Sequence, residues 1–274
     1  FATGRKPVVT LATREGFALR LTADHRVRAV SARTRWRREE TWIPAGALKP
    51  GDEIVLNDHR AAPDWAGAGT FEQGFLLGLL IGDGTLKDDA AILSAWMPRA
   101  VANGAPDGEA GIEAMMRAAT DAAAALPHRA DWRGWHEIAG RDEWRLKSAA
   151  LRDLAFAFGL ASGAKTVTPL CERASSAFQR GLLRGLFDTD GSVQGSQSKG
   201  GSVRLAQSDA APLEAAQRML LRLGIVSTLY RDRRPAGTRA LPDGKGGTKD
   251  YPTEAQHELV VANDNLARFA ERIG

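Results

Sequence analysis

Two apolar runs with the same residue pattern dominate the hydropathy of this 274-residue chain. They are LLGLLIGDG at 76–84 and LRGLFDTDG at 183–191. Both runs are too long and too evenly apolar for half-buried strands, so both predict helices. Each predicted helix has glycines one turn apart, which are Gly74, Gly78, Gly181 and Gly185. Glycine costs a helix about 1 kcal/mol relative to alanine. We therefore expect the two glycine stripes to let the helix backbones pack closely against each other.

A carboxylate lies near the end of each predicted helix, Asp83 in the first and Asp190 in the second. The glycine after each, Gly84 and Gly191, is expected to end its helix in the left-handed conformation. The helix dipole disfavours a carboxylate in the last turn, and side-by-side helices would bring both charges to one end. A cation would offset these charges, and oxygen ligands favour Mg²⁺. Paired ions of this kind suit in-line attack on a phosphodiester.

These two runs resemble the paired signature motifs of single-chain LAGLIDADG homing endonucleases, with the second run the closer match. The resemblance covers roughly residues 70 to 274. The first run departs from the pattern, with Ile81 and Gly82 where the family usually has Asp-Ala. The last acid of each motif, which is the family's metal ligand, is present in both runs. The metal-site residues that the resemblance implies are Asp83, Asp190, Gly82 and Thr189.

The resemblance implies a site-specific endonuclease that hydrolyses both strands of a long double-stranded DNA target. It implies Mg²⁺ as the cofactor, with Mn²⁺ able to substitute and Ca²⁺ binding without supporting cleavage. The family often has a lysine on an inner strand near the metals and a polar residue opposite. We assign these supporting catalytic roles to Lys147 and Gln207, for which plain surface exposure is the alternative.

Strand ribbons fit the major groove of DNA, and basic loops beside them would contact phosphates. The tract 231–249 is rich in basic residues, glycine and proline, which predicts a phosphate-binding hairpin loop; a solvated flexible loop is the alternative. A net charge of +4 is compatible with a polyanionic partner. The predicted DNA-binding residues are Arg133, Arg141, Arg145, Lys199, Arg204, Arg231, Arg233, Arg234, Arg239, Lys245 and Lys249.

The amino-terminal part of the chain predicts strands near 17–22, 27–30 and 53–56. Thr22 and His25 form a T-x-x-H motif, and LKPGDEIVL follows it. Together these features resemble the amino-terminal half of a Hint (intein splicing) domain. In that family the threonine and histidine polarise the scissile peptide bond, so the pair here is interpreted as a splicing-motif remnant.

Splicing by this chain is not expected. It begins at Phe1 and ends at Ile273-Gly274, whereas the acyl shift needs a Cys or Ser nucleophile at the start and a His-Asn pair at the end. We therefore expect an intein-derived endonuclease that carries part of a splicing domain.

The predicted fold class is α+β. Two pseudo-symmetric αββαββα half-domains, at 69–170 and 171–274, form a DNA-binding saddle of antiparallel sheets, preceded by a small all-β partial Hint domain at 1–68. The resemblance implies a monomer with an internal pseudo-two-fold axis.

Composition excludes other classes. No apolar run reaches 18 residues, so no membrane partner is expected, and the amino terminus lacks a signal-peptide pattern. The single cysteine, Cys171, suits the cytosol, and we expect a cytoplasmic protein of a bacterium or archaeon. Three alternatives remain: a protein-splicing element, a catalytically inactive LAGLIDADG nucleic-acid-binding protein, and an α+β domain whose glycine-rich helices merely pack.

Overall fold

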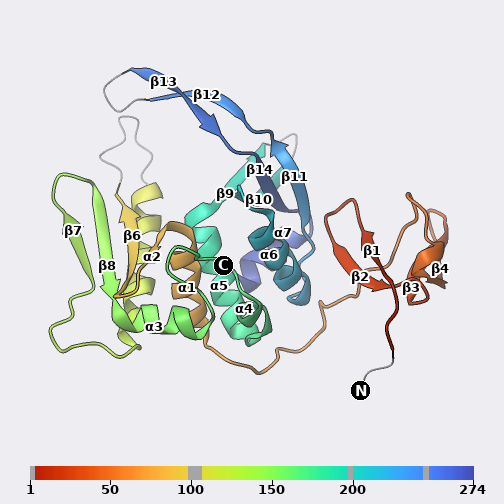
Figure 1. The fold of residues 1–274 in the computed structure, drawn as a ribbon, viewed down its shortest axis with the longest axis horizontal. Helices are drawn as coiled ribbons and strands as arrows, with labels where there is room; N and C mark the ends of the chain where they lie inside the picture. Colours follow the sequence, from red (N-terminus) through yellow and green to blue (C-terminus); the bar gives the residue numbers. More distant parts are fainter. Residues whose placement is uncertain (1–3, 98–106, 197–199, 243–246) are drawn as a thin grey trace.

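The computed structural model describes residues 4–97, 107–196, 200–242 and 247–274. Figure 1 shows two halves built around a central pair of helices, with a small group of strands at the amino-terminal side. The central helices are α1 (Phe71–Asp83) and α5 (Ser176–Asp190). They are the two helices predicted from the apolar runs.

Local sequence explains where the two central helices begin. The Thr70 hydroxyl oxygen caps α1 by accepting a hydrogen bond from the Gln73 amide, and the Gln73 side-chain oxygen accepts one from the Thr70 amide, forming a capping box. Ser175 caps α5 by accepting from the Phe178 amide at 3.0 Å. Both caps satisfy amide groups that the first helical turn leaves without a partner.

The first half contains a four-stranded antiparallel sheet. Its strands are β5 (Thr85–Leu86), β6 (Ala91–Trp96), β7 (Trp135–Ile138) and β8 (Glu143–Ser148), in the order β5-β6-β8-β7. The helices that complete this half are α2 (Asp107–Ala124) and α3 (Ala149–Ala157). The element order after α1 is therefore ββαββα, as predicted.

The second half repeats this arrangement. Its sheet contains β9 (Gly191–Ser196), β10 (Gly200–Gln207), β11 (Thr228–Arg234) and β14 (Gln256–Ala262), in the order β11-β14-β10-β9. Its further helices are α6 (Ala210–Arg222) and α7 (Asn265–Arg272), and α4 (Pro169–Arg173) connects the halves. In both sheets the first strand of the half pairs with the second, the second with the fourth, and the fourth with the third. The α+β prediction with antiparallel sheets is confirmed.

One feature of the second half has no counterpart between β7 and β8, the equivalent strands of the first half. A separate two-stranded ribbon of β12 (Gly237–Pro242) and β13 (Thr248–Thr253) stands between β11 and β14. The tract predicted as a hairpin loop is thus largely regular strand in its described part. In Figure 1 the ribbon extends away from the sheet of the second half.

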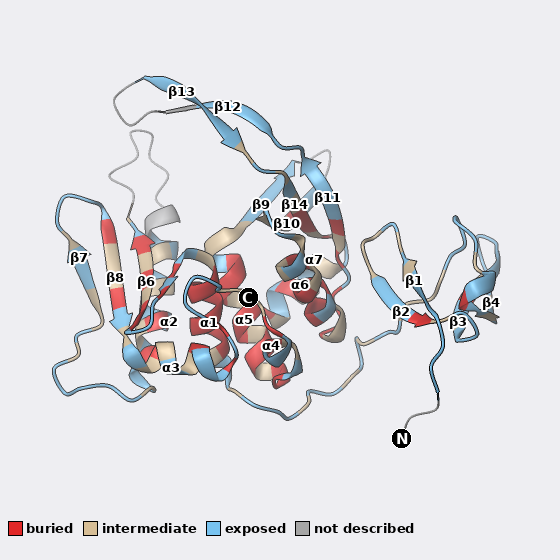
Figure 2. Ribbon diagram, in the orientation of Figure 1, coloured by how far each residue is buried: buried red, intermediate tan, exposed pale blue. Residues whose placement is uncertain are grey.

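The core is continuous across the two halves, because the central helices are buried on nearly all sides (Figure 2). Among their fully buried side chains are Leu76, Leu80, Phe178 and Leu182. A helix that is apolar all round is a buried one. The burial of α1 and α5 therefore explains why their sequences are so evenly apolar.

The amino-terminal strands form two hairpins, β1 (Val8–Ala12) with β2 (Ala18–Thr22), and β3 (Arg26–Arg33) with β4 (Arg38–Pro44), followed by a 3-10 turn at Ala45–Ala47. The prediction of a strand near 53–56 is wrong, because Ile54 makes only a single isolated bridge, to Ala29. The hairpin tip at Glu15 attaches this part to the second half, where its carbonyl accepts hydrogen bonds from the Leu229 amide (2.9 Å) and Gln217 Nε2 (2.8 Å).

Candidate metal centre at the ends of the paired helices

The four stripe glycines lie where α1 and α5 touch. A Cβ on any of them would fall within 3.0 Å of backbone atoms of the opposite helix, a separation that real side chains do not show. For Gly78 the neighbours are the Leu182 carbonyl and the Cα of Gly185; for Gly74 they include the Phe178 carbonyl. The stripes therefore allow direct backbone contact between the helices, and this contact sets their ends side by side.

Both helices end at the glycines that were predicted to end them, but the predicted left-handed conformation is wrong. Gly84 has φ −89° and ψ 175°, and Gly191 has φ −78° and ψ 156°, so both are extended. Glycine is required at both positions because there is no room for a side chain. A Cβ on Gly84 would lie 2.7 Å from the Leu80 Cα, and one on Gly191 would lie 2.9 Å from the Phe187 carbonyl carbon.

The carboxylate of Asp83 lies close enough to Asp190 to act on its pKa. Burial raises the pKa of Asp83, and a nearby lysine opposes the shift. Burial also raises the pKa of Asp190, and repulsion from Asp83 raises it further. Two neighbouring carboxylates, Asp83 exposed and Asp190 half-buried, repel each other unless a cation neutralises them.

Lys165 supplies one such cation, and sequence reasoning missed it. It lies in the loop between α3 and α4, and its Nζ donates a hydrogen bond of 2.5 Å to the Gly82 carbonyl. Burial lowers the pKa of this ammonium, while the charges of Asp190 and Asp83 raise it. The sequence holds one signal: Lys165 is the only charged residue between Asp153 and Glu172.

The two predicted supporting residues lie in different surroundings. Gln207, at the end of β10, donates a hydrogen bond from Nε2 to Asp190 Oδ2 at 2.7 Å, which holds that carboxylate. Lys147, on β8, is largely exposed and forms an ion pair with Asp89 at 3.4 Å. Thr189 packs against Gly82, and its hydroxyl donates to main-chain carbonyls within α5.

The donor set at this place fits Mg²⁺ or a similar hard cation. Within the described ranges, no group of three or more His, Cys, Asp or Glu side chains could hold an ion by itself. Mg²⁺ is commonly bound by one or two carboxylates, with waters and substrate phosphates completing its shell. Asp83 and Asp190 provide two carboxylates from neighbouring helix ends, and the repulsion between them favours occupation by a cation.

Several predicted DNA-binding arginines lie on the sheet faces opposite the helices. Arg145 pairs with the buried Glu143 at 2.6 Å, on the face of β8 opposite the buried Leu146. In the second half, the buried Glu258 pairs with Arg204 (3.3 Å) and Arg233 (2.7 Å). A buried carboxylate thus holds arginine side chains on each sheet.

The remaining predicted DNA-binding residues lie on loops and strands at the edges of this face. Arg133 and Arg141 are exposed in the loops before and after β7. Arg231 pairs with Glu214, and Arg234 donates to Gln256 at 3.1 Å. Arg239 and Lys249 are on the β12–β13 ribbon. Lys199 and Lys245 lie outside the described residues.

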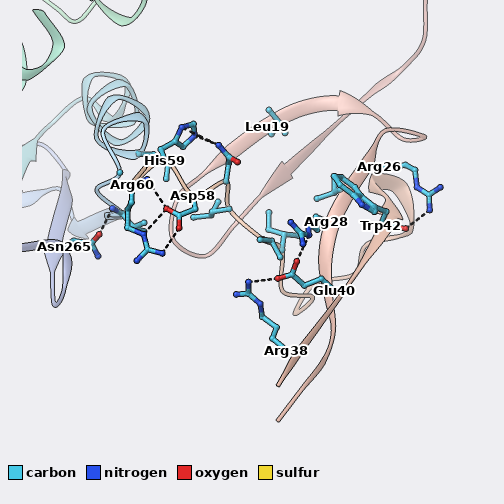
Figure 3. A pocket seen from close by; sticks show the side chains of 18 of the residues that line it. Leu19, Arg26, Arg28, Arg38, Glu40, Trp42, Asp58, His59, Arg60 and Asn265 are labelled. Carbon is cyan, nitrogen blue, oxygen red and sulfur yellow. Dashed lines mark hydrogen bonds and ion pairs between the residues drawn. The ribbon is translucent and has the colours of Figure 1, made fainter. Parts of the chain in front are cut away.

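The splicing-motif residues lie apart from the paired carboxylates in the chain and in their contacts. Thr22 ends β2, and the His25 amide donates to its carbonyl at 3.0 Å. His25 also lines a cleft of about 1060 Å³ between the amino-terminal strands and the second half. Figure 3 shows this cleft, with arginines from β3 and β4 paired to Glu40 and with Arg60 paired to Asp58.

Comparison with known proteins finds a match to a family within the second half of the chain. Residues 177–274 match the family described as LAGLIDADG-like domain. The α subunit of the Bacillus subtilis ribonucleoside-diphosphate reductase NrdEB is 25% identical over 239 residues, covering 80% of this chain and 20% of the relative. The replicative DNA helicase DnaB of Rhodothermus marinus is 30% identical over 285 residues, covering 100% of this chain and 27% of the relative. The chain thus spans about a quarter or less of these relatives.

Solved structures include similar chains. One, of mesophilic variants of the homing endonuclease I-DmoI, is 14% identical with a TM-score of 0.42, covering 74% of this chain and 95% of its own. Another, of I-DmoI in complex with DNA and Mn, is 13% identical with a TM-score of 0.40, covering 74% and 96%. The N-terminal LAGLIDADG domain of DUF199/WhiA is 15% identical with a TM-score of 0.38, covering 79% and 88%.

None of the helices in the described ranges has the length and hydropathy that a membrane crossing requires.

Proposed function

We propose that this chain is a site-specific DNA endonuclease of the LAGLIDADG type that cuts both strands with divalent metal ions held by Asp83 and Asp190. The observation that carries the proposal is that α1 and α5 are in backbone contact and each ends in a carboxylate, with the charge of Asp83 acting on the half-buried Asp190. The family match of residues 177–274 supports it, because that segment includes α5 and Asp190.

Hydrolysis of a phosphodiester builds negative charge on the phosphoryl oxygens, and stabilising this charge is the main task of such a site. Asp83 and Asp190 would hold the divalent metal ions, which would supply Lewis acidity to the reaction. Gln207 orients the Asp190 carboxylate through its 2.7 Å hydrogen bond. Lys165, fixed by the Gly82 carbonyl, presents an ammonium beside both carboxylates, where it stabilises developing negative charge.

In this proposal, duplex DNA binds to the sheet faces opposite the helices. The equal strand order of the two sheets supports a pseudo-two-fold axis through the α1–α5 pair. Each half would then act on one strand of the DNA. Arg145 in the first half, and Arg204 and Arg233 in the second, would contact phosphates or base edges there. One chain contains both halves, so a monomer suffices.

Cleavage of a randomised duplex library tests the proposal. The purified chain should cut a small subset of sequences when Mg²⁺ is present and none when it is chelated, with Ca²⁺ supporting binding alone. Sequencing of the cut ends would give the target. Binding of duplex DNA without cleavage in any divalent cation would instead favour the catalytically inactive alternative.

The roles of the two lysines are separated by one matched pair of substitutions. We expect Lys165→Met to slow single-turnover cleavage by about 10²-fold, the scale of a lost electrostatic stabiliser. Lys147→Met, which removes an exposed ion pair with Asp89, should have little effect on the rate. DNA affinity, measured in Ca²⁺, serves as the control for folding. A larger effect at Lys147 would return the supporting role to that residue.

A second candidate function, as part of a protein-splicing element, is favoured by the curated relatives. A reductase and a helicase each match this chain over a fraction of their own length. Neither reductase nor helicase activity accounts for a segment that both proteins share. Such a segment is typical of an element inserted into different host proteins. The test places the chain between two reporter domains, with Cys before Phe1 and His-Asn after Gly274. Ligated reporters that disappear in His25→Ala would support splicing, and intact precursor alone would reject it.

A further inference from the structure

The β12–β13 ribbon makes the two halves unequal. In the first half, four residues (139–142) join β7 to β8. In the second half, residues 235–255 separate the equivalent strands β11 and β14. The pairing of β11 with β14 reaches as far as Arg234 and Gln256, the residues on either side of this segment. The ribbon is therefore an insertion at a place where a short turn would complete the sheet.

The ribbon stands free of the rest of the described structure. Its strands pair with each other over six positions and belong to no larger sheet. Its residues 237–240 and 248–252 are all exposed. An isolated two-stranded ribbon is only marginally stable in water, so this element is of the kind that gains order from a partner. In Figure 1 it projects from β11 and β14.

Strand alternation gives the ribbon two chemically different faces. Arg239 lies directly opposite Tyr251 in the register, and Lys249, two residues before Tyr251, shares their face. The Lys249 ammonium lies 5.9 Å from the centre of the Tyr251 ring, which places these side chains together. The other face carries Thr238 and Ala240, the latter opposite Asp250. The two described cations of these strands are thus on one face, with the aromatic ring, and the acid is on the other.

Basic residues also lie where the ribbon leaves the sheet. Arg231, Arg233 and Arg234 occupy the end of β11, where the ribbon begins. Arg233 pairs with Glu258 on the face of the sheet opposite the helices, and its guanidinium lies 4.5 Å from the centre of the Tyr230 ring. Arginine and tyrosine thus recur together from the sheet to the ribbon, a combination that suits a phosphate–sugar backbone.

We propose that the β12–β13 ribbon is a DNA-binding arm that lays the face of Arg239, Lys249 and Tyr251 on duplex flanking the part held by the two sheets. Arg239 and Lys249 contact phosphates, and Tyr251 packs against the sugars between them. Because a four-residue turn takes the place of the ribbon between β7 and β8, the arm lengthens the protected DNA on one side only. This inference rests on the proposed binding of duplex DNA, and it adds that the bound DNA extends further on the side of the second half.

The test compares three variants with the unaltered chain by nuclease footprinting and by the salt dependence of affinity in Ca²⁺. The first is Arg239→Ala/Lys249→Ala, and the second replaces residues 235–255 by the four-residue turn of the first half. The matched control is Thr238→Ala, on the opposite face of the same strand. The DNA is the duplex recovered from the cleavage library or, where nothing is cut, a random-sequence duplex for the salt series.

The double variant should lower the slope of log affinity against log salt by about 1.8, from two phosphate contacts at about 0.9 each. Both arm variants should lose protection at one end of the footprint, and Thr238→Ala should retain it. An unchanged slope and footprint, or an equal loss in Thr238→Ala, overturns the arm while leaving the proposed function intact. A chain that binds no duplex DNA overturns both.

Discussion

Replacing Asp83 or Asp190 with asparagine should reduce the rate of DNA cleavage by about 10³-fold or more. Asparagine keeps the shape of the side chain but removes the negative charge that holds a hard cation. Loss of a metal that stabilises transition-state charge removes several kcal/mol, and each 1.36 kcal/mol is tenfold in rate. Affinity for DNA should be retained, because each substitution also removes a charge that repels phosphates. Single-turnover cleavage in Mg²⁺ and binding in Ca²⁺ measure the two effects separately.

Asp188 offers a matched control on the same helix. It lies two residues before Asp190, is half-buried, and pairs with Arg184 at 2.8 Å. Asp188→Asn makes the same chemical change next to the proposed metal centre without removing a proposed ligand. It should leave the cleavage rate within a few-fold of the unaltered chain. Full cleavage by both Asp83→Asn and Asp190→Asn would remove the metal-centre proposal, and equal losses at Asp188 would point to damage to α5 instead.

The second large effect is expected on stability. Gly78→Ala should lower the free energy of unfolding by about 2 to 3 kcal/mol, within the range of overpacking penalties. The added Cβ would lie 2.8 Å from the Gly185 Cα, so the helices could accept it only by moving apart. That movement would loosen packing of the buried leucines on both helices. Denaturant unfolding, with the midpoint and slope compared between variants, measures the change.

The control for this change is a glycine in a helix without such a neighbour. A Cβ on Gly111, in α2, would meet nothing within 4 Å. Gly111→Ala should therefore raise the free energy of unfolding by up to about 1 kcal/mol, through helix propensity alone. The same substitution then has opposite signs at two positions. A stabilised Gly78→Ala would show that the backbones do not touch there.

Backbone contact also links stability to the proposed chemistry. Asp83 and Asp190 are the last residues of the helices that the glycines bring together. Separation of the helices would move the carboxylates apart, so we expect any stripe variant that remains folded to cut DNA more slowly.

Much of the fold was accessible from the sequence, because its signals are local. An apolar run that never alternates marks a buried helix, and the glycine after each aspartate marks where that helix ends. The repeat of the two runs, followed by similar patterns, predicted two αββαββα halves and antiparallel sheets. Glycines one turn apart predicted close helix packing, because only close approach offsets their cost to a helix.

Other features were decided by tertiary structure. Gly84 and Gly191 were assigned to left-handed caps, yet they are glycines because a Cβ would collide with the preceding turn. Lys165 lies in an aperiodic loop, where no pattern shows that its ammonium reaches the Gly82 carbonyl, 83 residues away in the chain. The attachment of the Glu15 carbonyl to Gln217 joins residues 202 apart, and hydropathy alone does not encode it.

The sequence by itself therefore determined the two helices, their glycine stripes, their terminal aspartates and the order of elements around them. The tertiary structure decided which side chains surround the aspartates, how Gln207 and Lys165 come to lie beside them, and that the basic tract after β11 forms a two-faced ribbon. Burial periodicity and end-caps are properties of neighbouring residues, whereas contacts across a hundred residues depend on the path of the whole chain.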